Sequence, residues 1–237
     1  MNLTKAEIKQ LKDKKFRKQN NLFMVEGEKF CFDVLHSGVK ILYTITSNKN
    51  LTEFPNICVV SEQVLSGLAS TVTNQNIICV CEFVKPNIES VGNCLILDNL
   101  QDPGNVGTLI RSALAFGFKD IYLVGGADAF SEKVIRSSAG LVLQTRVHVV
   151  GFEEILNNKT KIAKHFYVAD MDGENINQTP LPKGRVAVVV GNEGNGVSQE
   201  FLRLADKKIS IPMQPCVESL NAGVAGSIIM QKLSEVK

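Results

Sequence analysis

The sequence has no apolar run that approaches the roughly 18–20 residues needed to cross a bilayer. Its first residues are charged, and no apolar stretch of the kind found in secretory signals follows them. Both absences weigh against insertion into a membrane and against secretion. We therefore expect a cytoplasmic protein that has no membrane partner.

Cysteine occurs six times, but never in a C-x-x-C pair or in another metal-ligand spacing. Reduced, buried thiols are the expected state of all six, Cys31, Cys58, Cys79, Cys81, Cys94 and Cys216. The three histidines, at positions 36, 148 and 165, are scattered and lack a partner motif. The sequence therefore predicts no metal centre.

The usual nucleotide fingerprints are also missing. The chain contains neither G-x-G-x-x-G nor G-x-x-x-x-G-K-[ST], the glycine-rich patterns that hold dinucleotides and phosphates. This absence weighs against a nucleotide-dependent oxidoreductase on a doubly wound sheet.

The chain carries little net charge, only +2, but the charge is unevenly placed. Residues 1–20 have seven Lys or Arg and two acids, so +5, which leaves −3 for the other 217 residues. A basic N-terminal arm would suit phosphate contacts. An amphipathic helix that packs through Leu3, Ile8 and Leu11 explains the segment equally well. Charge alone leaves both interpretations open.

What is present is the composition of an ordinary globular protein, with 44% hydrophobic and 21% charged residues. At 237 residues, the chain can form one large domain or a small domain and a larger one. Residues 22–83 alternate short helix-like and strand-like pieces, including a helix that ends at Gly38, and predict a small α/β unit. The polar segment "KPNIESVGN", residues 85–93, is the expected linker.

From residue 94 on, apolar strands alternate with helices, which predicts a parallel sheet covered on both faces. Strands are expected at "LILD", "IYLVG", "RVHVV", "FYVAD", "VAVVVG" and "KISIP", and helices near 105–116, 131–138, 152–163, 198–205 and 219–234. Such sheets bind ligands beyond the carboxyl ends of their strands. The loops after "LILD", "VAVVVG" and "KISIP" are therefore the candidate site.

The first loop belongs to "DNLQDPGNVGTLIRSALAFGF", residues 98–118. If a helix starts near Asn105, the long Arg111 side chain can lean back toward the loop and meet Asn105 at the mouth of the sheet. Alternatively, Asn105 is an N-cap and Arg111 a surface residue.

The second loop, in "VAVVVGNEGNGVSQEF", residues 186–201, has three glycines and Glu193 as the only charge among them. Glycines allow a ligand to approach the backbone closely, and an acid favours a cationic or hydroxyl-bearing ligand over a phosphate. The alternative is a flexible turn that leads to a helix capped by Ser198.

The third loop, in "ISIPMQPCVESLNAGVAGSIIM", residues 209–230, leads to an apolar helix for which Ser219 is a candidate cap. Gly223 and Gly226 inside this helix each cost about 0.5–1 kcal/mol relative to Ala. We therefore expect another helix or a partner subunit to pack closely against its backbone.

In their order and spacing, "DNLQDPGNVGTLIRSALAFGF", "VVVGNEGNGVS" and "ISIPM…ESLNAGVAGSI" resemble the three signature motifs of the SpoU (TrmH-type) RNA ribose 2′-O-methyltransferases of the SPOUT superfamily. The segment "SEKVIRSSAGLV" resembles the family's intermediate segment. This resemblance covers about residues 93–237. Residues 20–83 resemble the small RNA substrate-binding domain that is often joined to the methyltransferase.

The resemblance implies an α/β fold with a C-terminal α/β trefoil knot on a parallel sheet, residues 89–237. A small α/β RNA substrate-binding domain with a basic N-terminal arm, residues 1–88, would precede it. The methyl donor would be S-adenosyl-L-methionine, bound in the knot, and the protein would be a homodimer through the knotted domain. By motif, the backbone of Gly191, Ile211 and Leu220 would hold the adenosine part of the donor.

The resemblance also implies a catalytic centre made of five residues, Asn105, Arg111, Glu193, Ser219 and Asn221. Ser219 and Asn221 would orient Arg111 and the ribose, and Glu193 would fix the donor or Arg111. The family proposal makes Arg111 the general base. A guanidinium with a pKa above about 12 stays protonated, so a phosphate clamp is the simpler role, and both roles stay open.

The implied substrate is RNA, with ribosomal RNA favoured over transfer RNA by the separate N-terminal domain. The same activity on transfer RNA is the first alternative. A non-catalytic RNA-binding assembly factor is the second, and the complete set of site residues speaks against it.

Overall fold

The computed structural model describes residues 3–70, 76–83, 85–180 and 182–234. The chain divides into two compact units, residues 1–84 with 130–136 and residues 85–129 with 137–237. We call them the first and the second unit. Each has its own β-sheet and its own hydrophobic core. None of the helices within the described ranges combines the length and hydrophobicity that crossing a bilayer requires.

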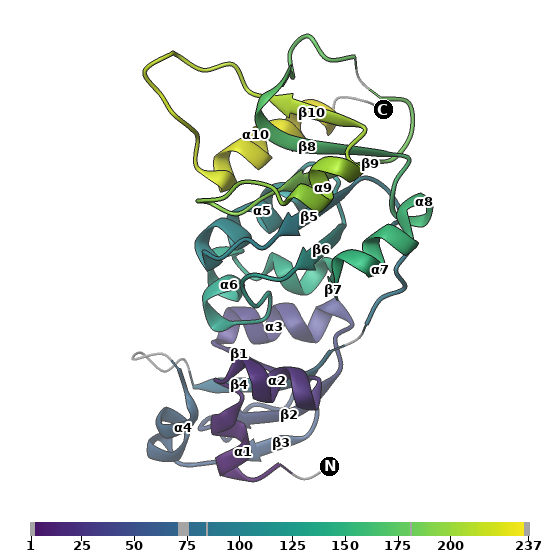
Figure 1. Cartoon of the computed structure of the whole chain (residues 1–237). Helices are drawn as coiled ribbons and strands as arrows, with labels where there is room; N and C mark the ends of the chain where they lie inside the picture. Colours follow the sequence, from purple (N-terminus) through teal and green to yellow (C-terminus); the bar gives the residue numbers. More distant parts are fainter. Residues whose placement is uncertain (1–2, 71–75, 84, 181, 235–237) are drawn as a thin grey trace. The chain divides into compact units, whose positions relative to one another are not determined.

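The strands of the first unit are β1 (Leu22–Glu26), β2 (Ile41–Thr46), β3 (Ile57–Val59) and β4 (Ile77–Glu82). Its helices are α1 (Lys5–Gln10), α2 (Lys14–Asn20), α3 (Glu28–Ser37) and α4 (Glu62–Leu68). The four strands form one sheet in the order β1-β4-β2-β3 (Figure 1). β4 is antiparallel to β1 and β2, whereas β2 and β3 are parallel.

The N-terminal segment consists of two short helices. The hydroxyl of Thr4 and the carboxylate of Glu7 each accept a hydrogen bond from the other's backbone N–H, a capping box that starts α1. The carboxylate of Asp13 caps α2 by accepting a hydrogen bond from the backbone N–H of Phe16 at 2.9 Å. Ile8 and Leu11 are buried in the core of the first unit. The amphipathic interpretation therefore describes how this segment packs.

β1 is the strand of the first unit that the sequence pattern did not indicate. Its five apolar and acidic residues directly follow a charged helix, and so short a run cannot be told from a buried helical turn by periodicity. Asn21 separates the two elements, because it adopts the left-handed conformation (φ 53°) that ends α2. A strand can therefore begin at the next residue.

The strands of the second unit are β5 (Cys94–Asp98), β6 (Asp120–Val124), β7 (Arg146–Val150), β8 (His165–Asn175), β9 (Val186–Val190) and β10 (Lys207–Ser210). They form one sheet in the order β10-β8-β9-β5-β6-β7, in which every pair is parallel. The predicted α/β class with a parallel sheet is confirmed. The knotted threading of its C-terminal segment stays a prediction.

The helices along this part of the chain are α5 (Pro103–Ala115), α6 (Glu132–Ser137), the 3-10 helix η1 (Leu141–Gln144), α7 (Phe152–Asn157), α8 (Lys159–Ile162), α9 (Gln199–Leu204) and α10 (Ala222–Ser234). The single helix expected over 152–163 is interrupted at Asn158. The Asn158 side chain donates a hydrogen bond to the carbonyl of Glu154 at 2.9 Å. An asparagine that bonds to the backbone in this way competes with helix continuation.

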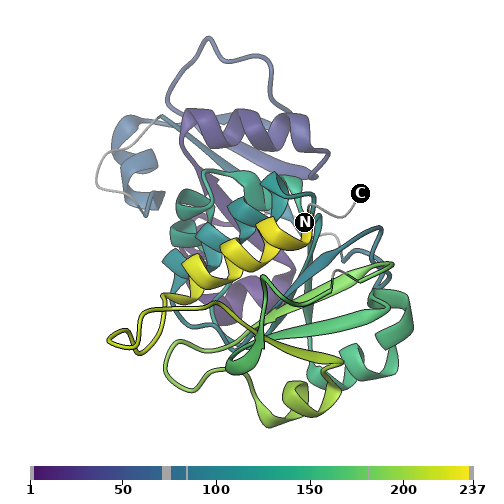
Figure 2. The same ribbon diagram turned by 90° about the horizontal axis from the view of Figure 1, so that it is seen from above.

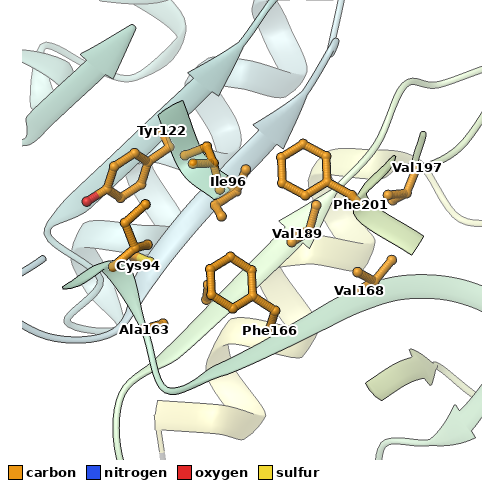
Figure 3. Close-up of a cluster of buried hydrophobic side chains, with 12 residues drawn as sticks. Cys94, Ile96, Tyr122, Ala163, Phe166, Val168, Val189, Val197 and Phe201 are labelled. Carbon is orange, nitrogen blue, oxygen red and sulfur yellow. The ribbon is translucent and has the colours of Figure 1, made fainter. Parts of the chain in front are cut away.

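Helices cover both faces of the sheet in the second unit. α7, α8 and α9 pack on one face around a hydrophobic cluster in which Ile96, Phe166, Val189 and Phe201 meet (Figure 3). α5 and α10 lie side by side on the other face (Figure 2). Since buried apolar area contributes about 25 cal/mol per Å², this two-sided burial is the main stabilising term of the unit.

The strand order creates a topological switch point between β5 and β9. From β5 the chain continues through α5 to its neighbour β6, whereas β9, the neighbour on the other side, comes much later. Leu97 pairs with Val190, so both strands end at the same level of the sheet. The loops that follow β5 and β9 therefore meet at the carboxyl edge, where such folds bind their ligands.

Candidate active site

Asp102 holds the loop between β5 and α5 in place, because it is the N-cap of α5. Its carboxylate accepts hydrogen bonds from the backbone N–H groups of Gly104 and Asn105, both at 3.2 Å. Pro103 takes the first helical position, where a backbone N–H would have no hydrogen-bond partner within the helix, so its absence costs nothing. The interpretation of Asn105 as the N-cap is therefore wrong, and its buried side chain is available for another contact.

Glu193 connects the loop after β9 to the loop after β5. Its Oε1 accepts hydrogen bonds from the Asp102 backbone N–H and from the side-chain amide of Asn105, both at 3.0 Å. Its Oε2 accepts from the backbone N–H of Gln101 at 3.2 Å. These donors are neutral, and no Lys or Arg of the described residues pairs with Glu193. The site therefore keeps an uncompensated negative charge.

The protonation state of Glu193 follows from these contacts. Partial burial raises the pKa of the carboxyl, but the hydrogen bonds from the Asn105 side chain and from nearby backbone N–H groups outweigh it. The result is a pKa below the ordinary value of 4.5. Glu193 is ionised at neutral pH because every donor favours the charged form.

Asn192 fixes the loop that carries Glu193. Its side-chain amide donates to the carbonyl of Asn99 at 3.0 Å, which ties this loop to the end of β5. Its Oδ1 accepts from the backbone N–H groups of Gly194 and Asn195, each at 3.0 Å. Asn192 and Gly196 also exchange two backbone hydrogen bonds, each of 2.9 Å. The second loop is thus a closed turn of defined shape.

Gly191 is required by this turn. A Cβ atom at residue 191 would collide with the backbone of Gly196 and Val197, which return across it. From the sequence, a ligand that approaches the backbone was the expected reason for the glycines of this loop. At Gly191 the chain's own backbone already demands a residue without a side chain.

Asn221 joins the third loop to the other two. Its side-chain amide donates to Oδ1 of Asn105 at 2.8 Å, and its own Oδ1 accepts from the backbone N–H of Val224 at 3.2 Å. Asn221 therefore caps α10, which begins at Ala222 and not at residue 219. The expectation that Ser219 is the cap is wrong, because the cap is the residue next to the first turn and Asn serves there as well as Ser.

Three of the five expected catalytic residues thus form one hydrogen-bonded chain, Glu193–Asn105–Asn221. Each of the three residues comes from a different sequence motif. Asn105 sits in the middle, donating to Glu193 and accepting from Asn221. Since an amide can do both at once, Asn is suited to this position.

Two glycines of α10 allow this chain to form. A Cβ atom at Gly223 would lie 3.0 Å from Oδ1 of Asn221 and 3.4 Å from Oδ1 of Asn105. A Cβ atom at Gly226 would collide with the side chain of Leu109 on α5 and lie 2.9 Å from Cγ2 of Val190. The expectation that another helix packs closely on this backbone is confirmed, and the helix is α5.

Arg111 and Ser219 lie outside the hydrogen-bonded chain. Both are exposed, and neither side chain forms a hydrogen bond or an ion pair with the described residues. Six residues separate Arg111 from Asn105, which is a rotation of about 240° around the helix at 3.6 residues per turn. The expected contact between Arg111 and Asn105 is therefore not found within this polypeptide, and the guanidinium faces solvent.

The three residues expected to hold the adenosine lie at the ends of two of these loops. Gly191 follows β9, and Ile211 and Leu220 stand at the two ends of the long excursion between β10 and α10 (Figure 1). Their backbone groups form no hydrogen bond with any residue of the described ranges. Donors and acceptors are therefore available at all three positions.

Three residues of the site were not predicted from the sequence, namely Gln101, Asp102 and Asn192. The Asp-Pro pair at 102–103 was a usable signal, since Asp before a proline is a helix start. Asn192 next to a glycine indicates a turn in the same way. Gln101 contributes only its backbone N–H. Every residue other than proline has this group, so the type of side chain cannot predict the contact.

These features define a class of protein with a parallel α/β fold and a cluster of loops at the topological switch point. The loops carry backbone groups without hydrogen-bond partners and the uncompensated carboxylate of Glu193. The model of the SpoU rRNA Methylase family matches residues 92–231. The chain therefore belongs to this family, as its three motifs predicted. A second model, described as an MRM3-like substrate binding domain, matches residues 5–79.

Named relatives span nearly the whole chain. The 23S rRNA (guanosine(2553)-2′-O)-methyltransferase RlmP of Bacillus subtilis is 31% identical over 95% of this chain and 93% of its own. The human mitochondrial rRNA methyltransferase 3 is 28% identical over 93% of this chain and 69% of its own. The crystal structure of an AdoMet-bound rRNA methyltransferase from Sinorhizobium meliloti superimposes with a TM-score of 0.87 at 26% identity, covering 98% of this chain and 94% of that one.

Proposed function

We propose that this protein transfers a methyl group from S-adenosyl-L-methionine to a ribose 2′-OH of ribosomal RNA. The observation that carries the proposal is the chain Glu193–Asn105–Asn221, which brings three separate family motifs together at one edge of the sheet. Two named relatives that cover almost the whole chain are rRNA methyltransferases, and one of them acts on a ribose 2′-OH.

The residues fit the donor in two respects. Its adenosine part needs backbone partners, and the backbone groups of Gly191, Ile211 and Leu220 have none among the described residues. Its sulfonium is a cation, and Glu193 supplies negative charge at the same edge of the sheet. When bound, S-adenosyl-L-methionine supplies an electrophilic methyl group.

In the proposed reaction the protein acts mainly through positioning, because holding two reactants in attack geometry can supply much of the rate. Asn105 and Asn221 orient the ribose, and Glu193 orients Asn105. Ser219 contributes a hydroxyl from the loop between β10 and α10, two residues before the α10 cap Asn221. Arg111 clamps an RNA phosphate, since its guanidinium faces solvent and a planar guanidinium can donate two parallel hydrogen bonds to phosphate oxygens.

The proposal includes a homodimer formed through the second unit. Val224 and Ile228, four residues apart on α10, are 46% and 40% exposed. Two large apolar side chains on one face of a helix favour a protein contact there. We also place the reaction in the cytoplasm, which the six free cysteines support because disulfides are rare there. The expectation that all six thiols are buried is wrong for Cys58 and Cys216, which are exposed.

The decisive experiment uses the purified protein, labelled donor and transcribed ribosomal RNA, followed by nuclease digestion. We expect a 2′-O-methylated nucleoside. Arg111→Ala should remove most turnover and leave donor binding, measured by calorimetry, unchanged. Label that appears only on a base would refute the ribose assignment, and label that appears only in transfer RNA would refute the ribosomal one. A loss of donor affinity would move Arg111 into the donor site.

A further inference from the structure

Resting on the proposed function, we propose that the exposed lysines of α1 and α2 form the surface that binds the phosphate backbone of folded ribosomal RNA. We call it the lysine surface, and it consists of Lys5, Lys9, Lys14, Lys15 and Lys18, all exposed. Lys5 and Lys9 are four residues apart on α1, and Lys14 and Lys18 are four apart on α2. Each pair therefore shares one side of its helix.

Acidic side chains do little to neutralise the lysine surface. Glu7 and Asp13 are the only acids in residues 1–20, and both carboxylates accept hydrogen bonds at the start of a helix. No ion pair to Lys5, Lys15 or Lys18 is found in the described ranges. The remaining 217 residues carry −3. The chain thus concentrates its positive charge here.

Three exposed or half-buried lysines elsewhere in the chain are neutralised by acidic partners. Lys40 pairs with Glu82 at 2.6 Å, Lys207 with Glu174 at 2.7 Å and Lys208 with Asp170 at 3.2 Å. The contrast matters for Lys5, Lys9, Lys15 and Lys18, because a surface cation without an acidic partner among the described residues can exchange its counterions for a phosphate. This release of counterions supplies most of the sequence-independent affinity for nucleic acids.

The two remaining cations of the segment hold the lysine surface in place. Arg17 is buried, and its guanidinium donates to the carbonyl of Leu11 at 2.6 Å, which links α2 to the end of α1. The ammonium group of Lys12 donates to the carbonyl of Ala69 at 2.6 Å, which links the segment to the residue after α4. The lysines therefore project from an anchored scaffold, and less conformational entropy is lost on binding.

The composition of the surface favours phosphates over bases. Phe16 is the only aromatic residue in residues 1–20, and it packs against the core of the first unit. Recognition of unpaired bases commonly uses exposed aromatic rings for stacking. Lysines without such rings suit the backbone of base-paired RNA, which is recognised by its shape and its phosphates.

The test is the triple variant Lys9→Gln, Lys15→Gln and Lys18→Gln in the full chain. Affinity for transcribed ribosomal RNA is measured by filter binding at several salt concentrations. Each lost phosphate contact should lower the slope of log K against log salt by roughly 0.7–0.9. We therefore expect a slope lower by about 2 and an affinity at least tenfold weaker. In methylation assays KM for RNA should rise while kcat stays constant.

A matched control removes the same charge from the second unit. Lys161, Lys164 and Lys183 are exposed near the amino ends of β8 and β9, opposite the candidate site. Replacing these three by Gln should leave slope and affinity unchanged. The corresponding Lys→Arg triple on α1 and α2 should retain RNA binding. Gln has nearly the helix propensity of Lys, and circular dichroism verifies folding of each variant.

An unchanged salt slope in the α1–α2 variant, or an equal loss of RNA affinity in the control variant, would contradict the proposed role of the lysine surface. A loss of affinity without a change of slope also overturns it, since phosphates would then not be the ligand. If wild-type protein binds RNA with a lysine-dependent salt slope but never methylates it, the proposed function is contradicted and the lysine surface stands. Methylation by wild-type protein with no effect of the lysines would leave the function standing and remove the surface.

Discussion

At the scale of single residues, Glu193 has the widest influence on the site. One carboxylate accepts three hydrogen bonds, two of them from the backbone directly before α5 and one from Asn105. Since Asn105 in turn accepts from Asn221, the position of Glu193 affects all three loops. Its charge and its geometry are therefore both needed.

We expect Glu193→Gln to lower the free energy of unfolding by about 0.5–1.5 kcal/mol at neutral pH, toward the low end because the carboxylate is exposed. The amide NH₂ of Gln would face an N–H donor where the carboxylate accepts. The folded-state pKa of Glu193 is depressed, so its contribution is fully present above the ordinary value of 4.5. It is lost as the pH falls through the lower folded value.

Denaturant unfolding between pH 7 and pH 3 measures this difference. The gap between wild type and Glu193→Gln should close as the pH drops below 4.5. Glu218→Gln is the control, because Glu218 is exposed on the neighbouring loop and has no hydrogen bond within the described residues. A gap that stays constant down to pH 3 would contradict the assigned role of the carboxylate.

At the scale of secondary-structure elements, the contact between α5 and α10 sets the geometry of the site. Asn105 and Asn221 belong to the N-terminal ends of these two helices, so their 2.8 Å hydrogen bond depends on how closely the helices approach. Gly223 and Gly226 permit that approach. The helix packing and the site are therefore one structural feature.

Gly226→Ala should destabilise the second unit although Ala is the better helix former. The new methyl group would collide with Leu109, and overpacking of this kind costs about 1–3 kcal/mol. The gain in helix propensity is about 1 kcal/mol or less. We expect a net loss in a thermal melt, together with reduced methylation.

Gly67→Ala on α4 is the matched control for this substitution. Its new methyl group would come no closer than 4.0 Å to another side chain, the flexible end of Lys9. That variant should be as stable as wild type or more so. Equal effects of the two substitutions would mean that backbone entropy, and not the approach of α5, governs Gly226.

At the scale of the whole molecule, the division into two units separates two tasks. The second unit contains the complete hydrogen-bonded chain of the site. The first unit contains the proposed lysine surface. The proposed homodimer adds a third task, the contact between subunits, for which the exposed Val224 and Ile228 of α10 would serve.

The double variant Val224→Glu and Ile228→Glu should convert a dimer into a monomer, because charges at the centre of an apolar contact are costly to bury. Size-exclusion chromatography with light scattering measures the mass. The control is Leu156→Glu with Met171→Glu, which changes two other exposed apolar residues of the second unit. A monomeric wild type, or a double variant that stays dimeric, would contradict this interface.

The amino-acid sequence was sufficient to predict the α/β class, the parallel sheet and the family. Buried parallel strands have to be continuously apolar, and loops of a site carry recognisable residue types. It also identified Asn105, Glu193 and Asn221, because each stands in a motif. Local signals misplaced the start of α10. The periodicity of α5 alone separates Asn105 and Arg111 by about 240° around the helix, and the expected contact between them overlooked this rotation.

The contacts among the site residues follow from the folded arrangement of strands and helices and could not be read from the sequence. Glu193 reaches Asn105 because β5 and β9 are neighbours in the sheet, although 88 positions separate the two residues. Asn221 reaches Asn105 because two glycines let α10 lie close against α5. Such contacts depend on strand order and helix distance, which are set by packing of the whole unit and not by any local stretch of chain.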